Sequence, residues 1–137
     1  MKYLREASWD EVYEQWRNGE VNQEFWKKIW KERGFDSWED FNALHIELVT
    51  RLGISRWKIF EVPAETVLDF QAGAYKSWIE RAKRAGGKSF RAIASLSDCK
   101  AHSKIQDFYQ HFPEETQLIG FRKNGAVILY EGHHRST

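Results

Sequence analysis

The chain has 137 residues and is nearly neutral, with 21 lysines and arginines against 20 aspartates and glutamates. This length predicts one domain with a single core, and the balanced charge excludes a global electrostatic field that attracts nucleic acid or membranes. The 7 tryptophans, 5 tyrosines and 9 phenylalanines are expected to fill that core.

The cellular compartment is also predicted from composition. Cys99 is the single cysteine, so an internal disulfide cannot form and a reducing, cytoplasmic location is expected. The first residues lack the apolar stretch of a signal peptide, and no apolar run reaches the roughly 18 residues of a membrane span. The sequence therefore predicts a soluble protein without a membrane partner.

The first third of the sequence predicts three short helices. Ser8 and Glu11 have the spacing of a capping box, which predicts a helix that begins there and ends at Gly19. Asn22 is expected to open a second helix, and Ser37 a third. Apolar residues three and four positions apart predict the buried faces: Trp9, Val12, Tyr13 and Trp16; Phe25, Trp26, Ile29 and Trp30; Trp38, Phe41, Leu44, Leu48 and Leu52.

After Gly53 the pattern changes, which predicts a helical region at 1–53 and a mixed region at 54–137 of one compact domain. Trp57–Val62 is typical of a strand, ended by Pro63. Tyr75–Ala85 predicts a helix that ends at Gly86 and Gly87, with Tyr75, Trp78, Ile79 and Ala82 inward. Ser89–Leu96 fits either state, and Ile105, Phe108, Tyr109 and Phe112 predict a last helix, stopped by Pro113.

The end of the sequence predicts a β-hairpin. Asn124 and Gly125 tolerate the positive φ values of a type I′ turn, and they separate two β-rich runs, 116–122 and 126–130. The second strand is therefore expected to lead directly into Glu131.

The five residues after this strand, Glu131-Gly132-His133-His134-Arg135, are the candidate site. Gly132 has no Cβ and lets the backbone approach a ligand, while the imidazoles and the guanidinium can donate to an anion. Glu131 could act as a general base or as a ligand of nucleotide-bound Mg²⁺. The alternative is a strand end followed by a frayed polar terminus.

These residues resemble the Gly-x-His-Arg and Gly-x-Arg-Arg signatures of the ParB/sulfiredoxin-like superfamily. The stretch from Trp57 to Arg135 is similar to uncharacterised bacterial ParB-like proteins with a Trp-rich helical N-terminus. The resemblance implies that helices pack on a small mixed sheet of ParB/sulfiredoxin-like type. It also implies that the loop of Gly132, His133, His134 and Arg135 holds the phosphates of ATP or CTP, with Mg²⁺.

The motif departs from the family in three ways. His133 stands where sulfiredoxin has its nucleophilic cysteine, so sulfinic acid reduction is not expected, and Cys99 cannot replace that thiol. His134 replaces one arginine of the ParB signature, which predicts weaker or pH-dependent phosphate binding. The family's motif opens a helix, whereas this sequence stops at Thr137, so an expected helix is either naturally absent or removed.

Two other groups of residues were considered as sites. Lys76, Arg81, Lys83, Arg84, Lys88 and Arg91 against Glu80 form a basic stretch that could neutralise nucleic acid phosphates, or be a solvated helix surface. The five histidines have no zinc-finger spacing, and a Walker motif is absent.

The sequence therefore predicts an α+β protein that binds a nucleotide or phosphorylated small molecule at 132–135. Phosphotransfer by Glu131 is the enzymatic version, for which a second acid or base is needed; the candidates are Glu61, Glu65 and Asp69. Whether the protein is an enzyme stays open. The alternatives are a non-catalytic module whose Trp-rich helices bind a protein partner, and a DNA-associated module that uses residues 76–91.

Overall fold

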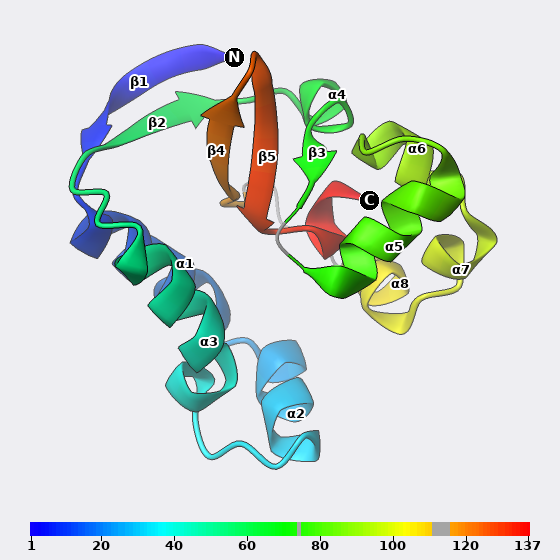
Figure 1. The fold of residues 1–137 in the computed structure, drawn as a ribbon. Helices are drawn as coiled ribbons and strands as arrows, with labels where there is room; N and C mark the ends of the chain where they lie inside the picture. The colour runs from blue at the N-terminus through cyan, green and yellow to red at the C-terminus, as the bar shows by residue number, and fades with distance from the viewer. Residues whose placement is uncertain (74, 111–115) are drawn as a thin grey trace. The chain divides into compact units, whose positions relative to one another are not determined.

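The computed structural model describes residues 1–73, 75–110 and 116–137, with the side chains of residues 104, 107–109 and 135 excepted. Over these residues the protein is a mixed α and β structure with two small sheets, which confirms the predicted α+β class (Figure 1). The fold consists of two compact units. Lys2–Glu61 form the N-terminal unit, and Val62–Thr137 form the C-terminal unit.

The N-terminal unit is a two-stranded antiparallel sheet joined to three helices. Strand β1 (Lys2–Ala7), which the sequence pattern did not predict, pairs with β2 (Trp57–Glu61) in a register that sets Ala7 opposite Trp57. Residues 57–61 therefore belong with the helices, whereas the sequence pattern placed the change near Gly53. Between the two strands lie α1 (Trp9–Glu20), α2 (Glu24–Glu32) and α3 (Trp38–Arg51).

The predicted helix starts depend on local hydrogen bonds. The Ser8 hydroxyl accepts from the Glu11 N–H at 3.2 Å, and the Ser8 N–H donates to the Glu11 carboxylate at 2.9 Å, which confirms the capping box. Ser37 caps α3 by accepting from the Asp40 N–H at 3.1 Å. The cap of α2 is Gln23 rather than Asn22, and α1 continues through Gly19 to Glu20.

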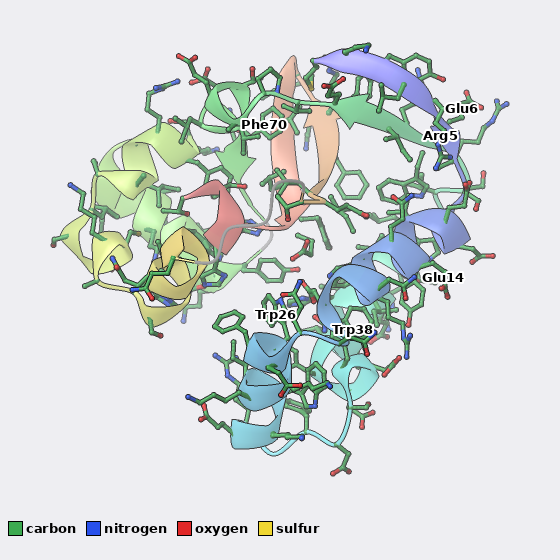
Figure 2. The ribbon with its side chains drawn as sticks, turned by 180° about the vertical axis from the view of Figure 1, so that it is seen from behind. Arg5, Glu6, Glu14, Trp26, Trp38 and Phe70 are labelled. Atoms are coloured by element: carbon green, nitrogen blue, oxygen red, sulfur yellow. The ribbon has the colours of Figure 1, made fainter. Side chains whose placement is uncertain are left out.

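Tryptophan side chains form the core of the N-terminal unit, as predicted. Trp16, Trp26, Trp30 and Trp38 are buried, and Figure 2 labels two of them, Trp26 and Trp38. The rings of Trp16 and Trp38 meet edge to face at 5.0 Å, and the Trp38 indole N–H donates to the buried carboxylate of Glu20 at 2.8 Å.

The predicted inner face of α3 is wrong at two positions. Leu44 and Leu52 are 61% and 50% exposed, whereas Trp38, Asn42 and Val49 are buried. With 3.6 residues per turn, a face centred on positions 38, 42 and 49 turns position 44 toward solvent. The Asn42 amide can be buried because it donates to the Trp38 carbonyl at 3.1 Å.

A three-stranded sheet forms the base of the C-terminal unit. Its order is β3 (Gln71–Ala72), β5 (Ala126–Glu131) and β4 (Ile119–Lys123), with β5 parallel to β3 and antiparallel to β4. Asn124 and Gly125 have φ values of 51° and 80°, which confirms the predicted hairpin turn. The parallel partner of β5 is thus β3, whereas the strand predicted at 57–62 pairs with β1 in the N-terminal unit.

The helices of the C-terminal unit lie together beside its sheet (Figure 1). Their inner side chains pack around one buried cluster. The helices are α4 (Ala64–Val67), α5 (Lys76–Ala85), α6 (Phe90–Ala94), α7 (Ser97–Lys100), α8 (Ser103–Gln110) and the 3₁₀ turn η1 (His134–Ser136). Ser89 caps α6 through the Ala92 N–H, so the ambiguous stretch is helical.

On α5 the prediction that Ile79 is inward is wrong, since it is 44% exposed while Trp78 and Ala82 are buried. The predicted stop of the last helix at Phe112 and Pro113 lies outside the described residues. The buried cluster comprises Phe70, Ala72, Trp78, Ala82, Phe90, Ile93, Cys99 and Leu129.

Candidate functional site

The candidate site lies where the two parallel strands of the C-terminal unit end. In the β3 and β5 pair, Ala72 is opposite Leu129, and a glycine follows close behind each strand, Gly73 after β3 and Gly132 after β5. Gly132 is buried and has a φ of 96°, a conformation that favours glycine. We call the residues 73, 75–77 and 131–137 the strand-end corner.

His133 holds the two strand ends together. Its ring is only 4% exposed, stacks on Trp78 with centroids 5.2 Å apart, and meets Phe90 edge to face at 5.7 Å. Its Nε2 lies 3.1 Å from the carbonyl oxygen and 3.4 Å from the amide nitrogen of Gly73, sixty residues away in sequence. With a proton on Nε2 the ring donates to that oxygen, which is the shorter contact. These contacts assign His133 a positioning role.

The residues after His133 form an ordered turn rather than a frayed terminus. The Ser136 N–H and hydroxyl both donate to the Gly132 carbonyl, at 3.1 and 3.0 Å, and the Thr137 hydroxyl donates to the His133 carbonyl at 2.9 Å. The ring of His134 lies between Trp78 and His102, with centroid distances of 5.1 and 5.0 Å. The side chain of Arg135, the predicted guanidinium donor, lies outside the described residues.

The side chain of Tyr75 packs against the end of β5 in the strand-end corner. The Tyr75 ring meets those of His133 and Tyr130 edge to face, at 5.4 and 6.2 Å. Burial, and then the charges of Tyr130 and Glu131, raise the pKa of the Tyr75 phenol well above its ordinary value. Tyr75 therefore stays protonated at neutral pH and can donate a hydrogen bond.

Helix α5 directs its N-terminal end into the same corner. Tyr75 precedes its first residue, provides no side-chain cap, and no acidic residue occupies the first turn. The backbone N–H groups of that turn give a partial positive charge, and Lys76 and Ser77 are exposed there. An anion at this point would meet a cation, a hydroxyl and the end of a helix.

The comparisons with known proteins assign no family to this chain. No family model, curated protein or solved structure matches the chain.

Among the described residues, no helix has the length and apolar character needed to cross a membrane. Nor do three His, Cys, Asp or Glu side chains within the described ranges lie close enough together to hold a metal ion.

The other acids considered for catalysis are not brought to the strand-end corner by the C-terminal unit. Asp69 precedes β3, at the opposite end of that strand from Gly73, and its carboxylate accepts from Arg91 at 3.1 Å. Glu65 is exposed in α4, and Glu61 belongs to the N-terminal unit, where it pairs with Lys2. Cys99 is fully buried, and burial raises the pKa of its thiol, so it is not a reactive nucleophile.

The basic stretch at 76–91 is partly neutralised. Arg84 donates to Asp98 at 2.7 Å, Arg91 is bound to Asp69, and the Arg81 guanidinium lies 4.7 Å above the Trp78 ring. The lysines at 76, 83 and 88 remain as exposed cations. The local charge available to a nucleic acid is therefore smaller than the sequence indicates.

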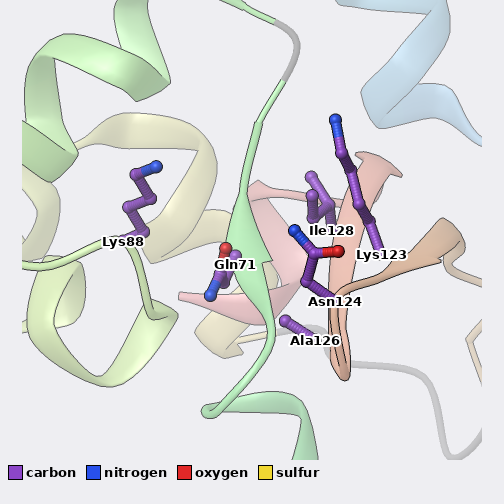
Figure 3. Close-up of a pocket in the computed structure, with 6 residues that line it drawn as sticks. All are labelled: Gln71, Lys88, Lys123, Asn124, Ala126 and Ile128. Carbon is purple, nitrogen blue, oxygen red and sulfur yellow. The ribbon is translucent and has the colours of Figure 1, made fainter.

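A hollow that the sequence did not predict lies at the other end of β5. It has a volume of about 320 Å³ and is lined by Gln71, Lys88, Lys123, Asn124, Ala126 and Ile128 (Figure 3). None of the predicted site residues lines it. In sequence these six residues are spread over three separate segments. Pairing of β3, β5 and β4 and the bridge between Gln71 and Ser89 bring them together.

Proposed function

We propose that the C-terminal unit binds a phosphate-bearing small molecule, with ATP or CTP as the candidate nucleotides, at the strand-end corner. The proposal includes a ParB/sulfiredoxin-like fold for this unit, in which the mixed sheet of β3, β5 and β4 carries the site. The support comes from the motif at 131–135 and from the parallel pairing of β3 with β5, the strand at whose end the motif begins.

The observation that carries the proposal is the meeting of two parallel strand ends and a helix N-terminus. Ligands of open sheets bind beyond the carboxyl ends of parallel strands, because the loops there diverge and leave room between them. Here β3 leads through Gly73 into α5, and β5 leads through Gly132 into η1. The contact between His133 and Gly73 fixes the two loops relative to each other.

The proposal gives separate roles to four side chains of the corner and to the N-terminus of α5. The N–H groups at the start of α5 and the Lys76 ammonium neutralise the phosphate, and Arg135 adds a guanidinium. His133 acts as a positioning residue rather than as a ligand contact, because its ring is enclosed by Trp78 and Phe90. In the enzymatic version of the proposal, Glu131 holds Mg²⁺ or accepts the proton of a hydroxyl acceptor.

Calorimetric titration with ATP and CTP, with and without Mg²⁺, tests this proposal. We expect saturable binding that weakens by about tenfold in Arg135→Ala and in Lys76→Ala, because each removes one cation from the phosphate. Lys83→Ala is the matched control, since it removes an exposed lysine from the last turn of the same helix. Absence of binding by every nucleotide, or equal weakening by Lys83→Ala, would contradict the proposal.

A protein-interaction function is the second candidate, and exposed apolar side chains favour it. On the sheet of the N-terminal unit, Tyr3 is 51%, Leu4 49% and Phe60 37% exposed, and the rings of Tyr3 and Phe60 contact each other at 5.7 Å. The tryptophans do not form this surface, because Trp16, Trp26, Trp30, Trp38 and Trp57 of this unit are all buried. Sedimentation at increasing protein concentration, with Leu4→Ser as the variant, tests whether this sheet binds another protein chain.

A further inference from the structure

Backbone pairing fixes the segments on both sides of the hollow beside the hairpin. On one side the segment before α6 is bound to β3, where the Ala72 N–H donates to the Lys88 carbonyl at 2.9 Å and Gln71 bridges to Ser89. On the other side Lys123 pairs with Ala126 at the base of the hairpin. Lys88 and Lys123 therefore stand on opposite sides of Gln71 and Ile128 (Figure 3).

The polar side chains that line the hollow are cationic or neutral. The lining provides two ammonium groups, from Lys88 and Lys123, two carboxamides, from Gln71 and Asn124, and the apolar side chains of Ala126 and Ile128. The lining residues include no carboxylate. Within the described residues, neither lysine forms an ion pair and neither carboxamide forms a hydrogen bond.

We propose that this hollow binds a small organic anion, whose charged group is a carboxylate or a phosphate. The two ammonium groups supply the attraction, and the carboxamides can orient the oxygen atoms because each offers two N–H donors. Ile128 and Ala126 contact the short apolar part of the ligand. The volume of about 320 Å³ is at the lower end for ligand pockets, which favours a metabolite-sized molecule over a nucleotide.

This site is independent of the proposed function. The hollow lies where β5 begins, and the strand-end corner lies where β5 ends, so the two share no residue. A nucleotide at the corner and an anion in the hollow would therefore perturb different backbone amides. Loss of one site leaves the other testable.

Titration of the ¹⁵N-labelled full chain with succinate, with inorganic phosphate and with neutral succinamide tests the proposal. We expect saturable shifts of the amides of Gln71, Lys88 and Lys123–Ala126 with at least one of the anions, and none with succinamide. The better of the two anions identifies the charged group. Added salt should weaken the binding, because the attraction is between exposed charges.

Variants of Lys88 and Lys123 test whether these two side chains bind the anion. Lys88→Gln and Lys123→Gln should each weaken binding by about tenfold or more, since each removes one of two charges. Lys83→Gln, an exposed lysine outside the hollow, should leave the affinity unchanged. The proposal is overturned by shifts that do not saturate with either anion, by equal binding of succinamide, or by an equal effect of Lys83→Gln. Shifts confined to 75–77 and 131–136 would instead place anion binding at the strand-end corner.

Discussion

Both units of this protein pair strands that lie far apart in the sequence, β1 with β2 and β3 with β5, but the two pairings bring different groups together. In the N-terminal unit, helices begin at Ser8 and Ser37 through bonds to residues three positions away. In the C-terminal unit, a buried imidazole contacts a backbone group sixty residues away, from His133 to Gly73. Both units bury aromatic rings. Strand pairing in the N-terminal unit brings the exposed side chains of Lys2 and Glu61 together, whereas in the C-terminal unit it brings the ends of β3 and β5 together beside the buried His133.

This difference explains where function is expected. A helix face depends on residues that are close in sequence, so its geometry changes little when distant segments change. The strand-end corner and the hollow depend on the register of β3 with β5, and a change at a single position on either strand can alter both. Substitutions can therefore separate the two units by their effects.

The largest expected effect is in the N-terminal unit, from Trp38→Ala. Trp38 is 1% exposed and donates to the buried Glu20 carboxylate, so the variant leaves a cavity and removes that donor. We expect the free energy of unfolding to fall by about 3–5 kcal/mol. Hydrogen exchange measured by mass spectrometry should locate the loss of protection in Lys2–Glu61. Leu44→Ala, at an exposed position of the same helix, should change the stability little. An equal loss of protection in both units would contradict the view that the two units respond separately to substitution.

His133→Ala should produce the corresponding effect in the C-terminal unit. The variant removes the stack on Trp78 and the contact with Gly73, for an expected loss of about 2–3 kcal/mol. His133→Phe keeps an aromatic ring and should recover about half of that loss. Urea unfolding of both variants provides the measurement. A His133→Ala variant as stable as the parent would show that the corner does not depend on this ring.

Two glycine substitutions, one in each unit, are expected to change the free energy of unfolding in opposite directions. A Cβ at Gly73 would lie 2.4 Å from the Ile128 side chain, so Gly73→Ala should destabilise by about 1–3 kcal/mol and shift β3 against β5. A Cβ at Gly19, in α1, meets no atom within 4 Å, and Gly19→Ala should stabilise by up to about 1 kcal/mol. Thermal unfolding of the two variants measures both changes in stability. A change in the same direction in both variants would contradict the explanation from packing.

The smallest expected effect is a pH dependence of the N-terminal unit. A hydrogen bond from Arg17 lowers the pKa of the Glu39 carboxyl below its ordinary value of 4.5. The stability that this pair provides is therefore complete above pH 4.5 and is lost as the pH falls through the lowered value. The effect is small because the Glu39 side chain is 43% exposed. Unfolding curves at pH 3 to 6 should differ from those of Glu39→Gln only at the acid end of the range.

Sequence reasoning was most accurate where a few neighbouring residues determine the structure. The capping box at Ser8, the cap at Ser37 and the turn at Asn124 and Gly125 were all predicted because their hydrogen bonds or φ values are local properties. The predictions for Leu44, Leu52 and Ile79 were wrong because an apolar residue at helical spacing has two possible faces, and packing against other elements selects one.

The candidate site was predicted as a stretch of sequence, but not as a structure. The pattern indicated the residues of 131–135, yet it gave no sign that His133 would be enclosed by Trp78 and Phe90. It also could not predict β3, because two residues are too short to show an alternating pattern. The hollow escaped prediction for the same reason, since its lining comes from segments that meet only across that strand.

The sequence by itself determined the helices that begin at Ser8 and Ser37, the hairpin and the aromatic composition of the cores, because local hydrogen bonds and burial of apolar surface depend on residue type and spacing. Only the tertiary structure decided which strand lies beside β5, which helix faces are buried, and that His133 binds the backbone of Gly73. These features depend on pairing between distant segments, whose free energy is a sum over many contacts that no single stretch of sequence contains.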